Sequence, residues 1–476
     1  MTTVHNAEPV ALDMVAPLEP ARFRDEVAAA VRGGARLSAW FHHQGRLWAA
    51  LARDEAGEIQ LACAPVQGSY PALTPRCAQA HWFERELFED SGIRPEGHPG
   101  LKPIRSGTAD FFRVEGEEIH EVAVGPVHAG VIEPGHFRFQ CHGEDVLHLE
   151  ISLGYQHRGV EAMLAGGPDR RTIHVVETLA GDTSAGHGAA YCQAVEALSG
   201  ARVSARAMAL RGVALELERL ANHAGDLGAL ANDVGYLPTA SFCGRIRGDF
   251  LNMTALLCGS RFGRGLLRPG GVGFDAEAGL RRELLRRLDE ALRDAAGAVE
   301  LLWKSESVMA RFEGAGTLAA ESCLELGLVG PAARAAGLDR DVRHDFPHGV
   351  YAFAQIPVST ARTGDVFARA YVRWLELQRS AAFVRDLLEH LPQGRLRAET
   401  GPLAAERICV SLVEGWRGEI CHVAVTDGQG RFSRYKVVDP SFHNWFGLAA
   451  AMRGQPISDF PLCNKSFNLS YCGHDL

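Results

Sequence analysis

The sequence predicts an α+β protein, with a mixed α/β domain over residues 1–105 and a mainly α-helical bundle domain over residues 106–476. Three observations carry this prediction. Apolar residues recur at helical spacing throughout residues 205–235, which predicts a long helix in a buried bundle. Alternating stretches such as HFRFQ and VLHLEISL predict small antiparallel β hairpins beside the bundle. At 476 residues the chain is also long enough for more than one domain.

The first domain is expected to mix helices and strands. PARFRDEVAAAVRGG has helical spacing and ends at a glycine pair, which predicts a helix over 20–32. Residues 36–66 read as strands separated by two short turns that contain glycine. A second helix is expected in HWFERELFEDSG, followed by a stretch rich in proline and glycine. We place the domain boundary at 104–108.

The second domain is expected to begin with a hairpin over 136–153. In its second strand the alternation places Leu147, Leu149, Ile151 and Leu153 on one face. Strands are expected again in ICHVAV and RFSRYKVV, which TDGQG separates as a turn. The last stretch, DFPLCNKSFNLSYCGHDL, is short and polar, and we expect it to be irregular.

Composition excludes several classes of protein. The net charge of -9 gives no basic surface for nucleic acid, so no nucleic-acid partner is expected. No apolar run is long enough to cross a membrane, and the first residues do not have the pattern of a secretory signal. None of the 11 cysteines forms a Cys-x-x-Cys pair, so we expect no iron–sulfur cluster or structural zinc in this chain. Unpaired cysteines favour the reducing cytoplasm.

Eight sequence blocks in order resemble a known family. They include GPVHAGVIEPGHFRF, GYQHRGVEAML, ELERLANHAGDLGALANDVGY, EGWRGE and DPSFHNWFGLAAAMRG. Together they resemble the large subunit of membrane-bound, energy-converting NiFe-hydrogenases such as that of formate hydrogenlyase. That subunit is homologous to the 49 kDa subunit of respiratory complex I. Residues 1–105, with WFERELFEDSGIRPEGHP, resemble the 30 kDa subunit of complex I.

The resemblance implies a NiFe ligand site that this sequence has lost. The family binds nickel and iron through two Cys-x-x-Cys pairs, one near each end of the subunit. The four matching positions here are Ala180, Thr183, Ser470 and Gly473. Nickel and low-spin iron need soft thiolate donors, which none of these side chains offers. We therefore expect no NiFe centre and no hydrogenase activity from this chain.

The complex I side of the resemblance implies a quinone site. In that family a histidine and a tyrosine hold the quinone headgroup. The histidine matches His157, which we expect to pair with Asp233, whereas the tyrosine position holds Gly181. Three interpretations stay open: a wider cavity, a different acceptor, and a cavity that has lost its function.

Four further residues are candidates through their family positions. Glu133 matches a carboxylate that relays protons in hydrogenases, although it also suits a turn cap before Pro134. Arg417 matches an arginine above the NiFe site, and a buried cation needs a partner, for which Asp182 is the candidate. His187 matches a histidine that supports the metal site in hydrogenases. Here a core histidine that contacts a helix terminus is the better interpretation, because the ligands are gone.

Two other groups of side chains have candidate roles. Asp182, His187, Cys472 and His474 have the types of side chain that bind zinc or iron, but no pair among them has an established ligand spacing. The charged residues of ELERL, at 216–220, are expected to form ion pairs on a helix surface or between helices.

Two functions from different classes follow. In the first, the chain is a peripheral subunit on the cytoplasmic side of a membrane-bound oxidoreductase. Electrons come from a 4Fe–4S cluster in a small iron–sulfur partner subunit and reach a quinone-like acceptor near His157, while Glu133, His157 and Asp233 handle protons. In the second, the chain is a redox-inactive coupling subunit that links the iron–sulfur subunit to antiporter-like membrane subunits.

Overall fold

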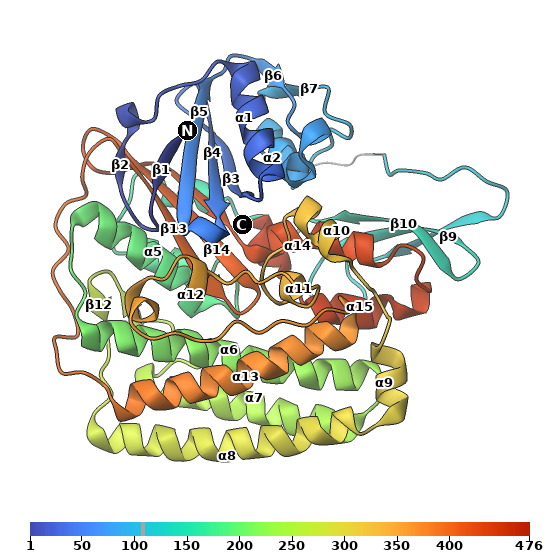
Figure 1. Ribbon diagram of the computed structural model, residues 1–476, viewed down its shortest axis with the longest axis vertical. Helices are drawn as coiled ribbons and strands as arrows, with labels where there is room; N and C mark the ends of the chain where they lie inside the picture. The colour runs from blue at the N-terminus through green and yellow to red at the C-terminus, as the bar shows by residue number, and fades with distance from the viewer. Residues whose placement is uncertain (106–109) are drawn as a thin grey trace.

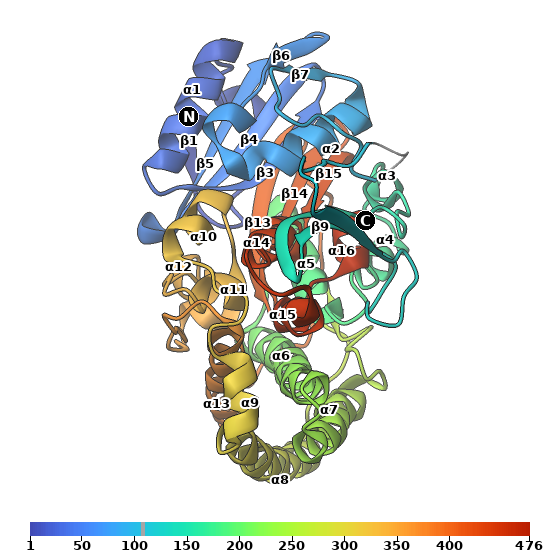
Figure 2. The same cartoon turned by 90° about the vertical axis from the view of Figure 1, so that its right-hand side faces the viewer.

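A computed structural model describes residues 1–105 and 110–476 and confirms the α+β class. Three layers stack along the longest axis: an N-terminal sheet with its helices, a central sheet, and a bundle of long helices (Figures 1 and 2). The expected domain boundary at 104–108 falls partly on residues 106–109, which lie outside the described part of the chain. No helix in the described residues is long and apolar enough to span a membrane.

The N-terminal layer is an antiparallel sheet in the order β1-β5-β4-β3, covered by helices α1 and α2. Glu19 begins α1 by accepting a hydrogen bond from the backbone N–H of Arg22, and Pro20 fits the first helical position. The elements are β1 (Thr2–Val4), α1 (Pro20–Arg32), β3 (Arg36–His43), β4 (Arg46–Arg53), β5 (Glu58–Pro65), β6 (Ser69–Pro71), α2 (His81–Ser91) and β7 (Arg94–Glu96).

The central layer is a sheet in the order β15-β14-β13-β2, and its last strand comes from the N-terminal segment. It is larger than the hairpin that the sequence predicts, because β13 was not expected. Helix α5 packs against β13 and β14. The elements are β2 (Val10–Ala11), α5 (Ser184–Ser199), β13 (Arg407–Gly415), β14 (Gly418–Thr426), β15 (Phe432–Val438) and α14 (Pro440–Ala451).

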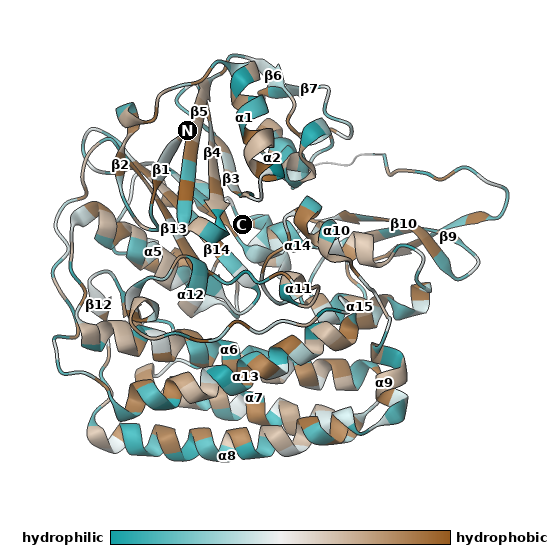
Figure 3. Ribbon diagram, viewed as in Figure 1, coloured by the Kyte–Doolittle hydropathy of each residue, from teal (hydrophilic) through white to brown (hydrophobic). Residues whose placement is uncertain are grey.

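The third layer is the expected helix bundle, in which α6 packs against both α7 and α13. Ser204 caps α6, and a Cβ atom on Gly228 would lie 2.7 Å from Cβ of Cys243, so this glycine lets α6 and α7 approach closely. Hydrophilic and hydrophobic residues alternate along α8 at the outer edge (Figure 3). The elements are α6 (Ala205–Asp233), α7 (Leu237–Cys258), α8 (Ala278–Trp303), α9 (Glu306–Phe312) and α13 (Val366–Glu389).

Smaller elements surround these layers. A separate antiparallel sheet in the order β10-β9-β8 extends to one side (Figure 1). Its elements are β8 (Ile119–Val124), β9 (His136–His142) and β10 (Asp145–Ser152). The remaining elements of the described residues are α3 (Val160–Leu164), α4 (Thr172–Val176), β11 (Leu267–Arg268), β12 (Gly271–Val272), α10 (Ala320–Leu326), α11 (Gly330–Arg334), α12 (Val342–Asp345), α15 (Phe460–Phe467), α16 (Tyr471–Asp475) and short 3-10 helices, among them η5 (Gly349–Ala352).

Two local expectations were wrong. The predicted inward face of β10 included Leu147, but a register shift between Val146 and His148 turns Val146 inward and leaves Leu147 41% exposed. The C-terminal stretch is not irregular, because it folds as α15 and α16. Phe460, Cys463 and Phe467 are buried at helical spacing, which fixes α15 against the core.

Candidate functional site

The loop that matches the first cysteine pair lies between α4 and α5 and contacts the C-terminal tail. Ala180 is fully buried. The Thr183 hydroxyl donates a hydrogen bond to Asp182 and accepts one from the Trp416 indole at 3.1 Å. Neither side chain has a free polar atom directed at a ligand, so this half of the former ligand set is part of the packed protein.

The two positions in the tail are occupied in the same way. The Ser470 hydroxyl caps α16 by accepting the backbone N–H of Gly473 at 2.9 Å. At Gly473 a Cβ atom would lie 2.7 Å from the Asp439 carboxylate. A cysteine side chain at position 473 would therefore meet the Asp439 carboxylate, so the tail as it is folded has no room for one there.

The predicted ion pair between Arg417 and Asp182 is confirmed. Its geometry is bidentate, with 2.6 Å from Nη1 to Oδ1 and 2.8 Å from Nη2 to Oδ2. Nε of Arg417 also donates to the Asn468 carbonyl, and the guanidinium lies 3.9 Å from the centre of the Trp416 ring. Burial alone would raise the pKa of Asp182, but the charge of Arg417 outweighs burial and lowers it. This pair connects the ligand loop to the tail.

His187 lies in a buried chain of hydrogen bonds. Its Nε2 is 3.0 Å from Asp439 and its Nδ1 is 3.1 Å from His422, whose Nδ1 is 2.9 Å from the Tyr435 hydroxyl. Asp439 caps α14, and its carboxylate can only accept hydrogen bonds. The proton of His187 is therefore assigned to Nε2, and Tyr435, His422 and His187 each donate in the direction of Asp439. The interpretation of His187 as a core histidine at a helix terminus is confirmed. No pattern in the sequence indicates that His422 and Tyr435 extend this series of hydrogen bonds.

The expected pair between His157 and Asp233 is absent from the described residues. His157 lies 2.8 Å from the backbone carbonyl of Asp475 through Nδ1. Because a carbonyl only accepts, Nδ1 carries the proton, and the exposed ring presents Nε2 to the outside. One Asp233 oxygen is buried without a hydrogen-bond partner, and burial raises the pKa of Asp233. Its helix end does not reach His157, so the two residues cannot act as one group.

The turn that carries His157 is held at the rim of the former metal site. The neighbouring residue, Arg158, donates to the carbonyls of Thr178 and Leu179 in the ligand loop, and its backbone N–H donates to the Leu476 carbonyl. In the same loop Gly181 is exposed, and a Cβ atom there would meet nothing within 4 Å. The position of the family tyrosine is therefore open, in the loop to which Arg158 attaches the His157 turn.

Glu133 is at the same rim. The Gln156 amide, next to His157 in the chain, donates a hydrogen bond to Glu133 at 2.7 Å. Glu133 is half-buried and, among the described residues, has no ion-pair partner. Its charge raises the pKa of Cys472, as does burial, which has the larger effect. The contact that the structure gives the Glu133 side chain is with Gln156, and it leaves the expected role in proton transfer a prediction.

The alternative zinc or iron site is contradicted by the geometry. His187 uses both ring nitrogens on Asp439 and His422, while Nδ1 of His474 contacts Asp475 and its ring packs against Trp82. Within residues 1–105 and 110–476, no three His, Cys, Asp or Glu side chains are grouped as metal ligands.

Sequence reasoning missed the role of Glu218. The stretch ELERL was expected to form ion pairs, and Glu216 and Arg219 do so in the interior. Glu218 instead accepts the backbone N–H groups of Ala185 and Gly186 at the start of α5, at 2.7 and 3.0 Å. Burial raises the pKa of Glu218 to about 8, against those two donors, and the charge of Asp182 adds to the rise. This carboxyl, with its raised pKa, lies beside the ligand loop.

Comparisons with known proteins agree with this architecture. The model of the family described as "Respiratory-chain NADH dehydrogenase, 49 Kd subunit" matches residues 233–407 and 398–475, and that of its 30 Kd subunit matches residues 46–112. The carbon monoxide-induced hydrogenase of Rhodospirillum rubrum is 32% identical over 73% of this chain and 97% of its own length. Formate hydrogenlyase subunit 5 of Escherichia coli is 28% identical over 84% of this chain and 76% of its own length.

A solved structure has the same fold. It is that of the membrane-bound sulfane sulfur reductase, an archaeal respiratory membrane complex. The match has a TM-score of 0.69 and 23% identity, and it covers 76% of this chain and 99% of that one. The extent of these matches confirms the resemblance expected from the eight sequence blocks. This chain belongs to the family of 49 kDa-type subunits that respiratory complex I shares with membrane-bound hydrogenases, and a segment like the 30 kDa subunit precedes that region.

Proposed function

We propose that this chain is the subunit at which a membrane-bound oxidoreductase complex delivers electrons to a quinone-like acceptor, without a NiFe centre of its own. Electrons come from a 4Fe–4S cluster held by a small iron–sulfur partner subunit. The chain supplies the binding surface and the protons. It lies on the cytoplasmic side and is attached to the membrane through antiporter-like partner subunits. Membership in a family of respiratory complex subunits supports this assignment.

The observation that carries the proposal is the exposed, oriented imidazole of His157. Its Nδ1 proton is fixed on the Asp475 carbonyl, so Nε2 faces outward. The open space at Gly181 lies in the loop to which Arg158 fixes the His157 turn. A planar headgroup placed there would contact one ring nitrogen and would not need a tyrosine on its other side.

Because Nδ1 of His157 carries a proton, binding of the acceptor is coupled to protonation of Nε2 on the same ring. A quinone carbonyl only accepts hydrogen bonds, so Nε2 can donate to it only when His157 is an imidazolium. Reduction to the hydroquinone consumes two electrons and two protons. The electrons come from the partner's cluster, and His157 gives one proton. Glu133, linked to the same turn through Gln156, is placed to supply the second or to restore the proton of His157.

A second function is favoured by a separate observation. The bidentate pair between Arg417 and Asp182 connects the ligand loop to the tail, where a cavity would otherwise remain. A filled site suits a coupling subunit that transmits movement between the iron–sulfur subunit and the antiporter-like subunits. In that case His157 has no role in electron transfer.

Substitution of His157 by alanine separates the two functions. In the complex purified with its native partners, we expect electron transfer from reduced methyl viologen to decylubiquinone to fall about 100-fold in His157→Ala, the scale of a lost proton donor. The amount of assembled complex should not change, because the side chain is exposed and bonds to one carbonyl.

His390→Ala is the matched control, since His390 is an exposed histidine at the end of α13. It should transfer electrons at the wild-type rate. If His157→Ala also keeps the wild-type rate and KM for decylubiquinone, the acceptor site is not at His157, and the coupling function takes precedence.

A further inference from the structure

A large cavity lies on the side of α5 away from the ligand loop. Its volume is about 760 Å³, and it opens between the C-terminal half of α5, the start of α6, residues 5–9, residues 346–351 and strand β13. Protein interiors are close-packed and leave few gaps larger than a water molecule. A space of this size falls within the range of small-molecule sites.

The walls of the cavity are mainly apolar. Ala197, Met208, Leu215, Phe346 and Val350 line it. All five belong to segments that the core already holds in place: α5, α6 and the turn around η5. A ligand with a largely apolar body would bury its surface here at about 25 cal/mol per Å² of apolar area.

The charged groups in the deep part of the cavity are already neutralised. Arg211 forms hydrogen bonds with both oxygens of Glu196 at 2.9 and 2.5 Å. Arg343 is paired with an aspartate and a glutamate, and Glu414 is paired with Arg334 at 2.8 Å. A charged ligand would find no free counter-charge at this depth and would lose its hydration, so an uncharged ligand is favoured.

Three polar side chains of the lining, those of His5, Arg202 and His348, have no hydrogen-bond or ion-pair partner among the described residues, and all three are exposed. Of these, the imidazole of His348 is the one that adjoins the apolar wall formed by Phe346 and Val350 in the same segment. The imidazole is exposed where it lines the cavity, and in its neutral form it offers one donor and one acceptor.

From the volume, the apolar walls, the paired charges and the free imidazole, we propose that this cavity binds an uncharged, mainly apolar small molecule that makes a hydrogen bond to His348. The site is separate from the acceptor site. None of the residues that line the cavity belongs to the ligand loop, to the turn that carries His157 or to the C-terminal tail.

The ligand would also contact a buried ion cluster, which joins the helix bundle to strand β13. The cluster is formed by Glu216, Arg219, Arg334, Arg343, Glu376 and Glu414. Arg343 and Glu414 line the cavity and belong to that cluster, and Tyr351, which also lines the cavity, donates to Glu216 at 2.7 Å. Occupancy would exclude water from these groups and strengthen their interactions. The expected effect is a ligand-dependent stabilisation of the contact between α6 and α13.

The test uses N-phenyl-1-naphthylamine, an uncharged fluorescent probe, with the purified full chain. We expect saturable binding of one probe per chain. Ala197→Trp and Met208→Trp fill the cavity from two helices, and each should weaken binding at least tenfold. Ala296→Trp, at an exposed position of α8, should bind as the wild type does. Thermal melting identifies any variant that does not fold.

Hydrogen exchange of the unmodified chain gives a readout that needs no variant. The bound probe should protect the backbone amides of residues 346–351 from exchange. The proposal is overturned if the wild type shows no saturable binding, if folded cavity variants bind like Ala296→Trp, or if protection appears only outside the cavity.

Discussion

At the scale of residues, an ion pair lies at the positions that match the family's metal-ligand loop. Arg417 is 3% exposed, so its charge needs a partner, and Asp182 meets it with two hydrogen bonds. The four cysteine positions no longer offer ligands, and each has a structural role or an apolar environment. The titratable side chains near these positions are those of His157, Glu133 and Glu218.

Removal of Asp182 should show what the pair contributes. Asp182→Ala leaves the Arg417 guanidinium buried without a carboxylate, and we expect it to lower the free energy of unfolding by about 2–4 kcal/mol. The figure is at the low end for a buried pair because the Asp182 side chain is 30% exposed. Urea unfolding followed by tryptophan fluorescence measures it, since Trp416 stacks on Arg417.

Asp249→Ala is the control for that variant. Asp249 pairs with Arg245 on the surface of α7, where an ion pair contributes about 0–1 kcal/mol. The double variant Asp182→Ala/Arg417→Met should recover much of the lost stability, because it removes the unpaired charge. Equal, small effects of Asp182→Ala and Asp249→Ala would show that the pair does not hold the loop to the tail.

Residue types predicted the pair of Arg417 and Asp182, because a buried cation restricts its partner to a nearby carboxylate. They did not predict the contact of His157. Its partner is a backbone carbonyl, which every residue has, so the sequence contains no mark of it. Leu147 was misplaced for a similar reason, because a β-bulge reverses the alternation without a change in composition.

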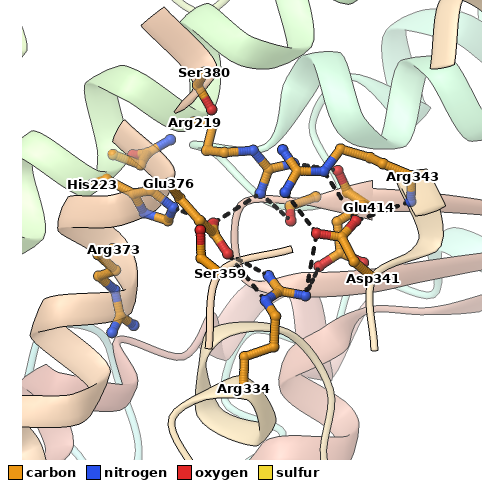
Figure 4. Close-up of polar contacts among 12 residues, drawn as sticks. Arg219, His223, Arg334, Asp341, Arg343, Ser359, Arg373, Glu376, Ser380 and Glu414 are labelled. Carbon is orange, nitrogen blue, oxygen red and sulfur yellow. Dashed lines mark hydrogen bonds and ion pairs between the residues drawn. The ribbon is translucent and has the colours of Figure 1, made fainter. Parts of the chain in front are cut away.

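At the scale of elements, a buried ion cluster holds the bundle to the central sheet. Glu376 of α13 accepts from Arg334 of α11 at 2.7 Å and from His223 of α6 at 2.7 Å, and Arg219 of α6 lies 3.5 Å away (Figure 4). Arg334 also contacts Glu414 of β13. One carboxylate therefore joins three helices, and a second connects them to a strand.

Glu376→Ala is expected to destabilise the chain by more than about 4 kcal/mol, because it leaves buried arginines without their shared carboxylate. The measurement is the yield of folded chain and its urea midpoint. Glu389→Ala is the matched control, since Glu389 is exposed at the end of the same helix. A folded Glu376→Ala variant with the midpoint of Glu389→Ala would contradict this role of the cluster.

Helical periodicity predicted α6 well because its apolar residues face neighbouring helices along its whole length. The same reasoning missed α15 and α16, since short helices of mixed polarity have little periodicity of their own. Tertiary packing of Phe460 and Tyr471 fixes them. Strand β13 was missed although it is buried, because its sequence, RICVSLVEG, does not alternate strictly between apolar and polar residues, and its partner β2 is distant in the sequence.

At the scale of the whole molecule, the two expected domains share more than a boundary. Strand β2, within residues 1–105, completes the central sheet by pairing with β13. Arg36 of β3 forms an ion pair with Glu419 of β14 at 2.5 Å, and Lys436 of β15 forms one with Glu86 of α2 at 2.6 Å. The N-terminal layer is therefore fixed to the sheet that carries Arg417, and the site is rigidly positioned relative to both.

The most direct test of this account is metal analysis of the complex purified with its native partners, together with infrared spectra in the region of iron-bound carbon monoxide and cyanide. The account predicts less than about one nickel per ten chains and no such bands, because hard or apolar side chains replace all four thiolates. One nickel per chain, or bands of iron-bound cyanide, would contradict it. The pair of Arg417 and Asp182 would then have to open around a metal held by other ligands.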